Sequence, residues 1–174
     1  MKEPAEATFQ VNADSDPVLL RIKGKANYLN CAPINRFFRL MIEKGNRRFV
    51  IDFGNCSGMD STFLGIIAGT AITVRNLGKS AYLVLTNLNA RNHELVENLG
   101  LHKLLTVDDG AYRQIAREVE EHGAGSRQQI LQDSAVDEAT MLKAHEALSS
   151  IDESNARKFQ DVVHFLKEQV ESGK

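Results

Sequence analysis

The sequence predicts an α/β fold in which a mixed β-sheet is flanked by helices and followed by a C-terminal helical hairpin. Short β-branched runs alternate with helical apolar patterns over roughly the first 120 residues. Beyond the glycine-containing segment around residue 125, the β-branched runs vanish and two amphipathic patterns remain. We therefore expect a domain over residues 1–122, a linker over 123–133 and a helical extension over 134–174.

The first elements follow from hydrophobic periodicity. Alternating residues predict strands over 8–11 and 18–23, joined by a polar turn as a hairpin. Apolar residues at helical spacing then predict a helix over 32–43, which a Gly-Asn pair ends. The apolar run 49–53 is typical of a strand buried on both faces of a sheet.

The second predicted helix begins at or beside Ser61. Asp60, Ser61 and Thr62 are three successive N-cap candidates before an apolar helical pattern that ends near Gly78. From local sequence alone, Ser61 is most simply a helix cap. Asp60 is either the true N-cap or a residue that orients a kinase or a metal, and these two interpretations have equal weight.

Four further segments complete the pattern. A strand is expected over 81–86, a helix over 90–99 and a short strand over 103–107. A last helix of the domain would carry Tyr112, Ile115, Ala116 and Val119.

In the extension, two apolar stripes predict two helices. The first stripe consists of Met141, Ala144, Leu148 and Ile151, and the second of Phe159, Val162, Val163, Leu166 and Val170.

Composition narrows the class of protein. The chain has 174 residues and a net charge of -2, with 21 basic residues scattered among 23 acidic ones, so we expect no nucleic-acid partner. No apolar run is long enough for membrane insertion, and the first residues do not form a signal peptide, so a cytoplasmic protein is expected. Cys31 and Cys56 are expected to be free thiols.

Three segments in order resemble the STAS domain family: residues 50–56, residues 58–65 and residues 95–107. The Met59-Asp60-Ser61 segment after an apolar strand is similar to the phosphorylated segment of bacterial anti-sigma-factor antagonists. The resemblance covers about residues 8–120 and implies that Ser61 is a phosphoacceptor at a helix N-terminus, with Thr62 as the alternative acceptor. It also implies a partner-binding surface formed by Asn27, Met59, Asp60, Ser61, Thr62 and Phe63.

Two positions depart from the family pattern. Phe63 stands where members commonly have glycine, so the helix entry or the docking face is expected to differ. Asn27 ends a Gly24-Lys25-Ala26-Asn27 segment where antagonists often have a carboxylate. The kinase partnership depends on how these two substitutions are accommodated.

The resemblance implies a regulatory binding module. In this hypothesis the unphosphorylated protein binds an anti-sigma-factor serine kinase of the GHKL type, which frees a sigma factor for transcription, and phosphorylation at Ser61 releases the complex. The alternative is a STAS subunit that docks on the ATPase of an ABC transporter, where the region of Ser61 is only a contact surface. A switch residue must be reached by a kinase, so we expect an exposed Ser61 hydroxyl.

An enzyme is the weakest hypothesis. Ser61 lacks the Gly-x-Ser-x-Gly motif of a hydrolase nucleophile, and a triad with His93 or His102 and Asp108 has no supporting spacing. We expect no cofactor and no metal site, since Glu97 replaces the second histidine of a zinc-binding pattern.

The extension leaves three alternatives open. We favour a hairpin packed on the domain over a free partner-binding arm, and a homodimer through the C-terminal helices is the third option. His145 and His164 are expected to be solvated positions on these helices.

Overall fold

The computed structural model describes residues 8–115, 117 and 128–173, and within them a mixed six-stranded sheet forms the centre. The strand order is β5-β4-β3-β2-β1-β6. Strands β2 to β5 are parallel, whereas β1 runs antiparallel to both β2 and β6. The strands are β1 (Thr8–Asn12), β2 (Val18–Ala26), β3 (Arg48–Met59), β4 (Tyr82–Thr86), β5 (Thr106–Val107) and β6 (Gln128–Leu131). The predicted fold class is confirmed.

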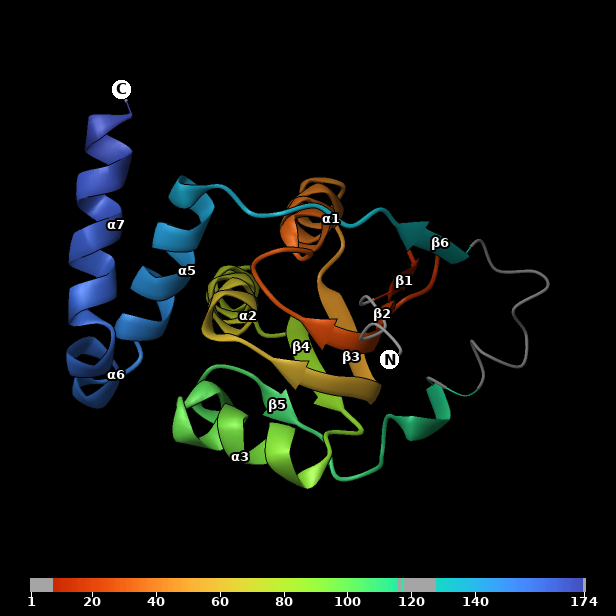
Figure 1. The fold of residues 1–174 in the computed structure, drawn as a ribbon. Coiled ribbons are helices and arrows are strands. Elements are labelled where there is room, and N and C mark those ends of the chain that lie inside the picture. The colour runs from red at the N-terminus through yellow and green to blue at the C-terminus, as the bar shows by residue number, and fades with distance from the viewer. Residues whose placement is uncertain (1–7, 116, 118–127, 174) are drawn as a thin grey trace, which may run out of the picture.

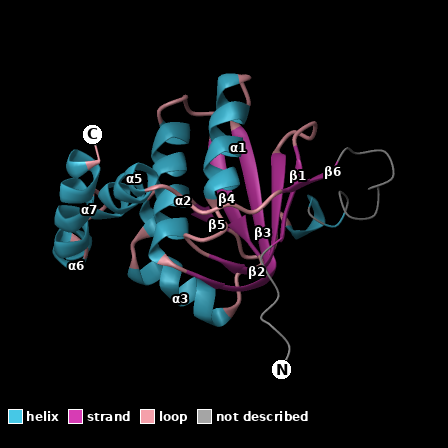
Figure 2. Ribbon diagram, turned by 45° about the horizontal axis from the view of Figure 1, so that its top comes forward, coloured by secondary structure: helices cyan, strands magenta, loops and turns pink. Residues whose placement is uncertain are grey.

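Helices cover the sheet in successive layers (Figure 1). α1 (Ala32–Glu43), α2 (Ser61–Arg75) and α3 (Ala90–Asn98) lie against one face of the sheet, as Figure 2 shows from a second angle. The C-terminal helices stack outside α2, with α5 against α2 and α7 against α5. These helices are α5 (Glu138–Ser149), α6 (Glu153–Lys158) and α7 (Gln160–Ser172).

The core lies between the sheet and the inner helices. Aromatic rings tie the layers together: Phe38 of α1 meets Phe49 of β3 edge-on at 5.6 Å between ring centroids, and Phe53 meets Phe63 at 6.3 Å. Burying each of these rings stabilises the fold by about 1.5–3 kcal/mol. The side chains that position α1 and α2 are therefore bulky and apolar.

Strand β3 is longer than the apolar run predicted. The expected strand ended at Phe53, but β3 continues to Met59, pairing in parallel with β2 as far as Ala26. Two register shifts, opposite Arg21–Lys23 and Gly24–Lys25 of β2, each place one extra residue in β3. The consequence is that a paired strand, not a loop, delivers the chain to the start of α2.

The end of the domain differs from the prediction at two places. Residues Leu101–Lys103 form a 3-10 turn, so the expected strand over 103–107 is reduced to β5. In the helix expected after Asp108, residues 113–115 and 117 are helical, while Ala116 and Val119 lie outside the described residues. Tyr112 packs against Tyr82 on the sheet face opposite to α2, at 6.0 Å between ring centroids.

The segment expected as a linker contributes to the sheet. Its described part includes β6, which pairs with β1 from Phe9 to Asn12. The chain then crosses the start of α1, where the N–H of Ala32 donates to the Ser134 carbonyl and the N–H of Val136 donates to the Tyr28 carbonyl. The extension beyond it has three helices instead of the expected two, because the chain breaks at Phe159 between α6 and α7.

Candidate functional site

Asp60 organises the start of α2. Its backbone N–H donates to the Ala26 carbonyl at the end of β2. One carboxylate oxygen accepts the N–H of Phe63 at 2.9 Å, which makes Asp60 the N-cap, and the other accepts the N–H of Tyr28 at 2.9 Å. Asp60 therefore fixes both the helix start and the neighbouring loop, and Ser61 is left as the first helical residue without a capping role.

The Ser61 hydroxyl is engaged by a histidine from the C-terminal extension. Ser61 Oγ lies 3.0 Å from Nε2 of His145, whose side chain is buried. Nδ1 of His145 lies 2.8 Å from the Met141 carbonyl oxygen, which can only accept. In the neutral imidazole, Nδ1 therefore carries the hydrogen and Nε2 accepts the hydroxyl hydrogen of Ser61.

Two expectations are corrected by this contact. The Ser61 hydroxyl is half-buried and hydrogen-bonded, not freely exposed, and His145 is buried, not solvated. The reason is that α5 lies directly on α2, so its inward face includes His145. His164 is exposed on α7 as expected and pairs with Glu168 at 3.2 Å.

The histidines weighed for a triad lie elsewhere. His93 pairs with Glu97 on the exposed side of α3 at 3.8 Å, and His102 is exposed in the 3-10 turn. Asp108 accepts hydrogen bonds from the Thr86 hydroxyl and from three backbone N–H groups, which lower its pKa although burial opposes them. Asp108 has a structural role in closing the turn after β5.

The other predicted site residues divide by burial. Asn27, Met59 and Asp60 are half-buried beside Ser61, so their side chains remain accessible at its edge. Thr62 and Phe63 are buried, at 4% and 0% exposure, because both face the interior from the first turn of α2. In this conformation neither side chain offers a partner contact, and the Thr62 hydroxyl is less accessible than that of Ser61.

Three candidate residues were missed in the sequence: two in one loop and a histidine of the extension. Tyr28 and Leu29 are 45% and 58% exposed in the loop that Asp60 holds beside Ser61. The available signal for an exposed contact surface was a pair of large apolar side chains in a turn between Asn27 and Asn30. His145 lies four residues after Met141 and three before Leu148, a spacing that places it on the apolar stripe of α5.

The contact of α5 with α2 is unusually close. A Cβ added at Gly65 would lie 2.3 Å from the Ala144 carbonyl oxygen, so only glycine fits there. One turn further along, a Cβ at Gly69 would lie 3.7 Å from the Ala147 Cβ, an ordinary contact. Ser61, Gly65 and Gly69 therefore form one face of α2 that the extension covers.

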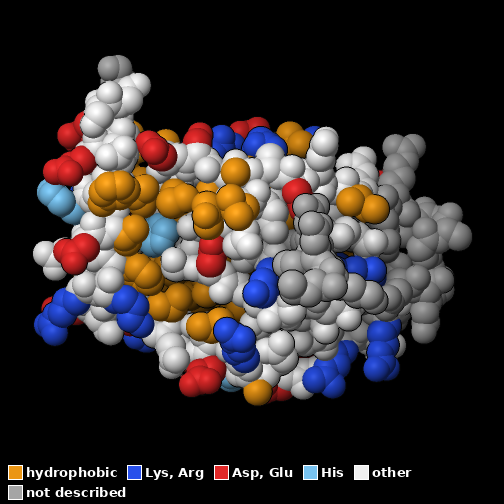
Figure 3. All heavy atoms as spheres, viewed as in Figure 1, with side chains coloured by type: hydrophobic (Ala, Val, Ile, Leu, Met, Phe, Trp, Pro, Cys, Tyr) orange, Lys and Arg blue, Asp and Glu red, His pale blue; other side chains and the backbone are white. Residues whose placement is uncertain are grey.

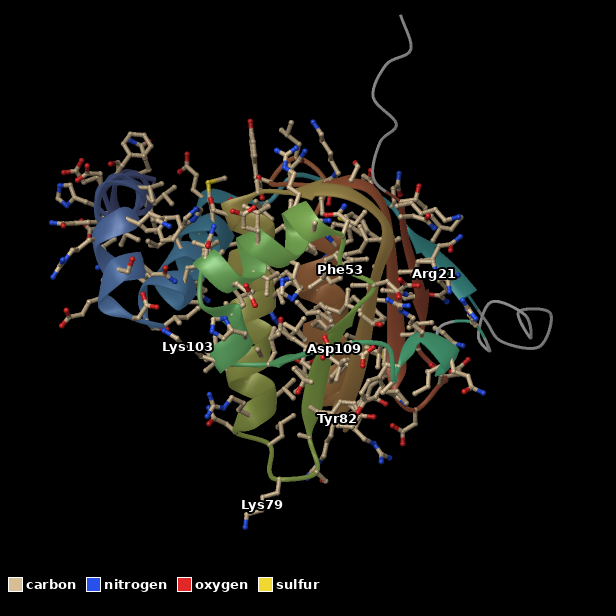
Figure 4. The ribbon with its side chains drawn as sticks, turned by 90° about the horizontal axis from the view of Figure 1, so that it is seen from below. Arg21, Phe53, Lys79, Tyr82, Lys103 and Asp109 are labelled. Carbon is tan, nitrogen blue, oxygen red and sulfur yellow. The ribbon has the colours of Figure 1, made fainter. Side chains whose placement is uncertain are left out.

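Polar contacts attach the region of α6 to the domain. The buried amide of Asn155 donates to the carbonyls of Leu99 and Leu148, at 2.8 and 2.9 Å. Lys103 reaches toward the extension, as Figure 4 shows, and pairs with Asp152 at 3.0 Å. The prediction of a packed extension thus agrees with the geometry of α5 and α6.

The two cysteines are free and buried, as expected. Burial raises the pKa of the Cys31 thiol to about 12, with a contribution from the Asp60 charge, and burial also raises that of Cys56. Both thiols are therefore poor nucleophiles. No helix in the described part of the chain has the length and apolar character that crossing a membrane requires.

Comparison with known proteins places this geometry in a family. A family model described as "Mlab, STAS domain" matches residues 9–106. No curated protein sequence matches the chain.

Solved structures share the fold at low identity. The anti-sigma factor antagonist SpoIIAA in its unphosphorylated form is 18% identical, with a TM-score of 0.51, and the match covers 64% of this chain and 97% of that one. The Bacillus cell fate determinant SpoIIAA in its phosphorylated form is 19% identical, with a TM-score of 0.50, covering 63% and 98%. The family match spans more than half of the sequence, and the chain belongs to the STAS domain family.

Proposed function

We propose that this protein is an anti-sigma-factor antagonist of the cytoplasm, a binding module and not an enzyme. In its unphosphorylated state it binds an anti-sigma-factor serine kinase of the GHKL type, and phosphorylation of Ser61 releases the complex. The sigma factor held by the kinase is free while the antagonist is bound.

The observation that carries the proposal is the division of roles at the start of α2. Asp60 caps the helix, so the hydroxyl of Ser61 has no part in capping. The explanation of the serine as the helix cap is therefore removed. The likeness in fold to SpoIIAA, which is solved in unphosphorylated and phosphorylated forms, supports the same role.

The helix terminus suits a reversible charge. Phosphorylation adds about -1.5 to -2 charges at one point, and the free N–H groups of the first turn offset an exposed anion by about 0.3–1 kcal/mol. Asp60 opposes this with its own negative charge. The α/β domain is expected to stay folded, whereas a partner surface fitted to the neutral hydroxyl must desolvate a charge, and a loss of about 2.8 kcal/mol weakens binding about a hundredfold.

The test is the affinity for a co-purified serine kinase, with and without ATP. ATP is expected to release wild-type protein, while Ser61→Ala should bind and stay bound. Ser61→Asp adds one charge, so it should bind more weakly than Ser61→Ala. If ATP leaves the wild-type complex intact and the two variants bind equally, the switch proposal fails.

A second candidate function uses the same surface without a switch. A STAS subunit docked on an ABC transporter ATPase would use Tyr28 and Leu29, which are exposed beside Ser61, as contacts. In that case the co-purified protein is a transporter ATPase, and its affinity does not depend on modification of Ser61.

A further inference from the structure

We propose that the face of α2 formed by Ser61, Gly65 and Gly69 is a docking surface shared by two competing occupants: the chain's own α5–α7 unit and the protein partner. The partner engages this face only after α5 has left it. The inference rests on the proposed function for the identity of the partner, but the movement of α5 can be measured without it.

The first support is how completely α5 occupies this face. Ser61, Gly65 and Gly69 are spaced four residues apart, so they lie along one line of the helix. The Ala144 backbone fills the space above Gly65, where a Cβ would stand 2.3 Å from its carbonyl oxygen. A second protein surface cannot reach Gly65 while Ala144 is there.

The second support is that the hydroxyl of Ser61 is already bonded. His145 accepts its hydrogen, and the histidine is held in place by the Met141 carbonyl and by an edge-on contact with Phe159 at 5.5 Å between ring centroids. A kinase that modifies Ser61 must separate these groups, because α5 stands against one side of the hydroxyl. The extension thus protects the residue proposed as the switch.

The third support is that the α5–α7 unit lies outside the family domain. It meets α2 most closely through Ala144, Ala147 and the buried His145. Leu148 of α5 is also fully buried in the core, so separation exposes apolar area that the partner must cover in turn. The matched family segment, residues 9–106, ends before this unit begins, so the domain is defined without it.

The occupant that replaces α5 should resemble it. A face lined by a hydroxyl and two glycines admits a helix with small side chains at the contact and apolar residues on either side. The exposed Tyr28 and Leu29 lie at the edge of this face and extend it. We therefore expect the partner to dock a helix over α2 and to contact this loop. Further apolar side chains gather on the visible face over α5 and α7, which would move with the unit (Figure 3).

The partner-free test measures access to position 61 in the full chain. Ser61→Cys is alkylated with iodoacetamide at about pH 9.5, where an ordinary thiol is ionised with or without a neighbouring imidazole. Cys31 and Cys56 are buried and serve as an internal check. Ala144→Leu, which wedges α5 away from α2, should speed alkylation at least tenfold, whereas Glu146→Leu on the exposed side of α5 should change it less than twofold. Equal rates in both variants would overturn the proposal.

A reversible lock covers the case in which Ala144→Leu does not fold. Cysteines at Gly69 and Ala147 would have their Cβ atoms about 3.7 Å apart, within the roughly 3.5–4.5 Å that a disulfide needs. Oxidised Gly69→Cys/Ala147→Cys protein should show at least tenfold slower amide exchange in α5 than the reduced form, and it should lose binding to the co-purified kinase until reduced. Equal binding by the oxidised and reduced forms would contradict the proposed competition between α5 and the partner. If α5 opens as described but no serine kinase binds, only the proposed function fails.

Discussion

The interior of the domain and its contact with the C-terminal extension differ in the residues that make their closest contacts. Inside the domain, α1 and α2 are fixed to the sheet by large buried rings such as Phe38, Phe49 and Phe63. Between the domain and the extension, the closest approach is glycine against alanine, supported by the hydrogen bonds of His145 and Asn155. Bulky packing resists separation, whereas close backbone contact is lost when a single side chain is added. The comparison therefore separates what keeps the domain folded from what keeps Ser61 covered.

The largest expected effect comes from the domain side. Phe38→Ala should lower the free energy of unfolding by about 3–5 kcal/mol, because it removes a buried ring that contacts Phe49 and leaves a cavity. Urea denaturation measures the loss. A change below about 1 kcal/mol would show that the domain does not depend on aromatic packing.

The next effect should be confined to the extension. Asn155→Ala removes two buried hydrogen bonds and leaves the Leu99 and Leu148 carbonyls without that donor, at a cost of about 1–3 kcal/mol. Amide exchange should rise in α5 and α6 and stay low in β3. Ser154→Ala, one residue away and exposed, is the control. Equal increases in β3 would mean that domain and extension unfold as one unit.

Two glycine substitutions in α2 should change the stability of the protein in opposite directions. Gly65→Ala places a Cβ against the Ala144 backbone, and overpacking of this kind costs about 1–3 kcal/mol, only partly offset by the better helix propensity of alanine. Gly69→Ala has room beside Ala147 and should gain up to about 1 kcal/mol. Thermal unfolding of the two variants side by side checks the signs. Stabilisation by both would contradict the close contact.

The smallest expected effect is the loss of stability at acidic pH. The pKa of Asp152 is lowered by the Asn155 N–H and then by Lys103, and that of Asp137 by the side chain and N–H of Thr140. Lowered folded-state pKa values mean that these carboxylates stabilise the chain above about pH 4 and lose that contribution as the pH falls through them. The urea midpoint should therefore drop on acidification, and drop less in Asp152→Asn. An identical pH dependence in the variant would exclude Asp152 as a contributor.

Sequence periodicity predicted most of the domain because its core is built from strong apolar patterns. Helix α1 has the predicted bounds, and the hairpin of β1 and β2 lies where alternation placed it. The length of β3 was missed because Gly54 to Ser57 carries no strand signal, and pairing with β2 overrides local propensity there.

The candidate site was only half predictable. Ser61 and Asp60 are close in sequence, so their relation at a helix start could be read locally. His145 is separated from Ser61 by 84 residues, and no local pattern encodes which helix face packs on which. The decisive signal, Gly65 facing Ala144, has meaning only once the two helices are in contact.

The most direct test of the account is to map phosphate after incubation of the full chain with the co-purified serine kinase and ATP. Ser61 and Thr62 are adjacent hydroxyls, but Ser61 is half-buried under α5 whereas Thr62 is 4% exposed and faces the interior. The account predicts phosphate on Ser61 alone, faster when α5 is displaced by Ala144→Leu and absent in Ser61→Ala. Phosphate on Thr62, or none at all from a kinase that binds the chain, would contradict it.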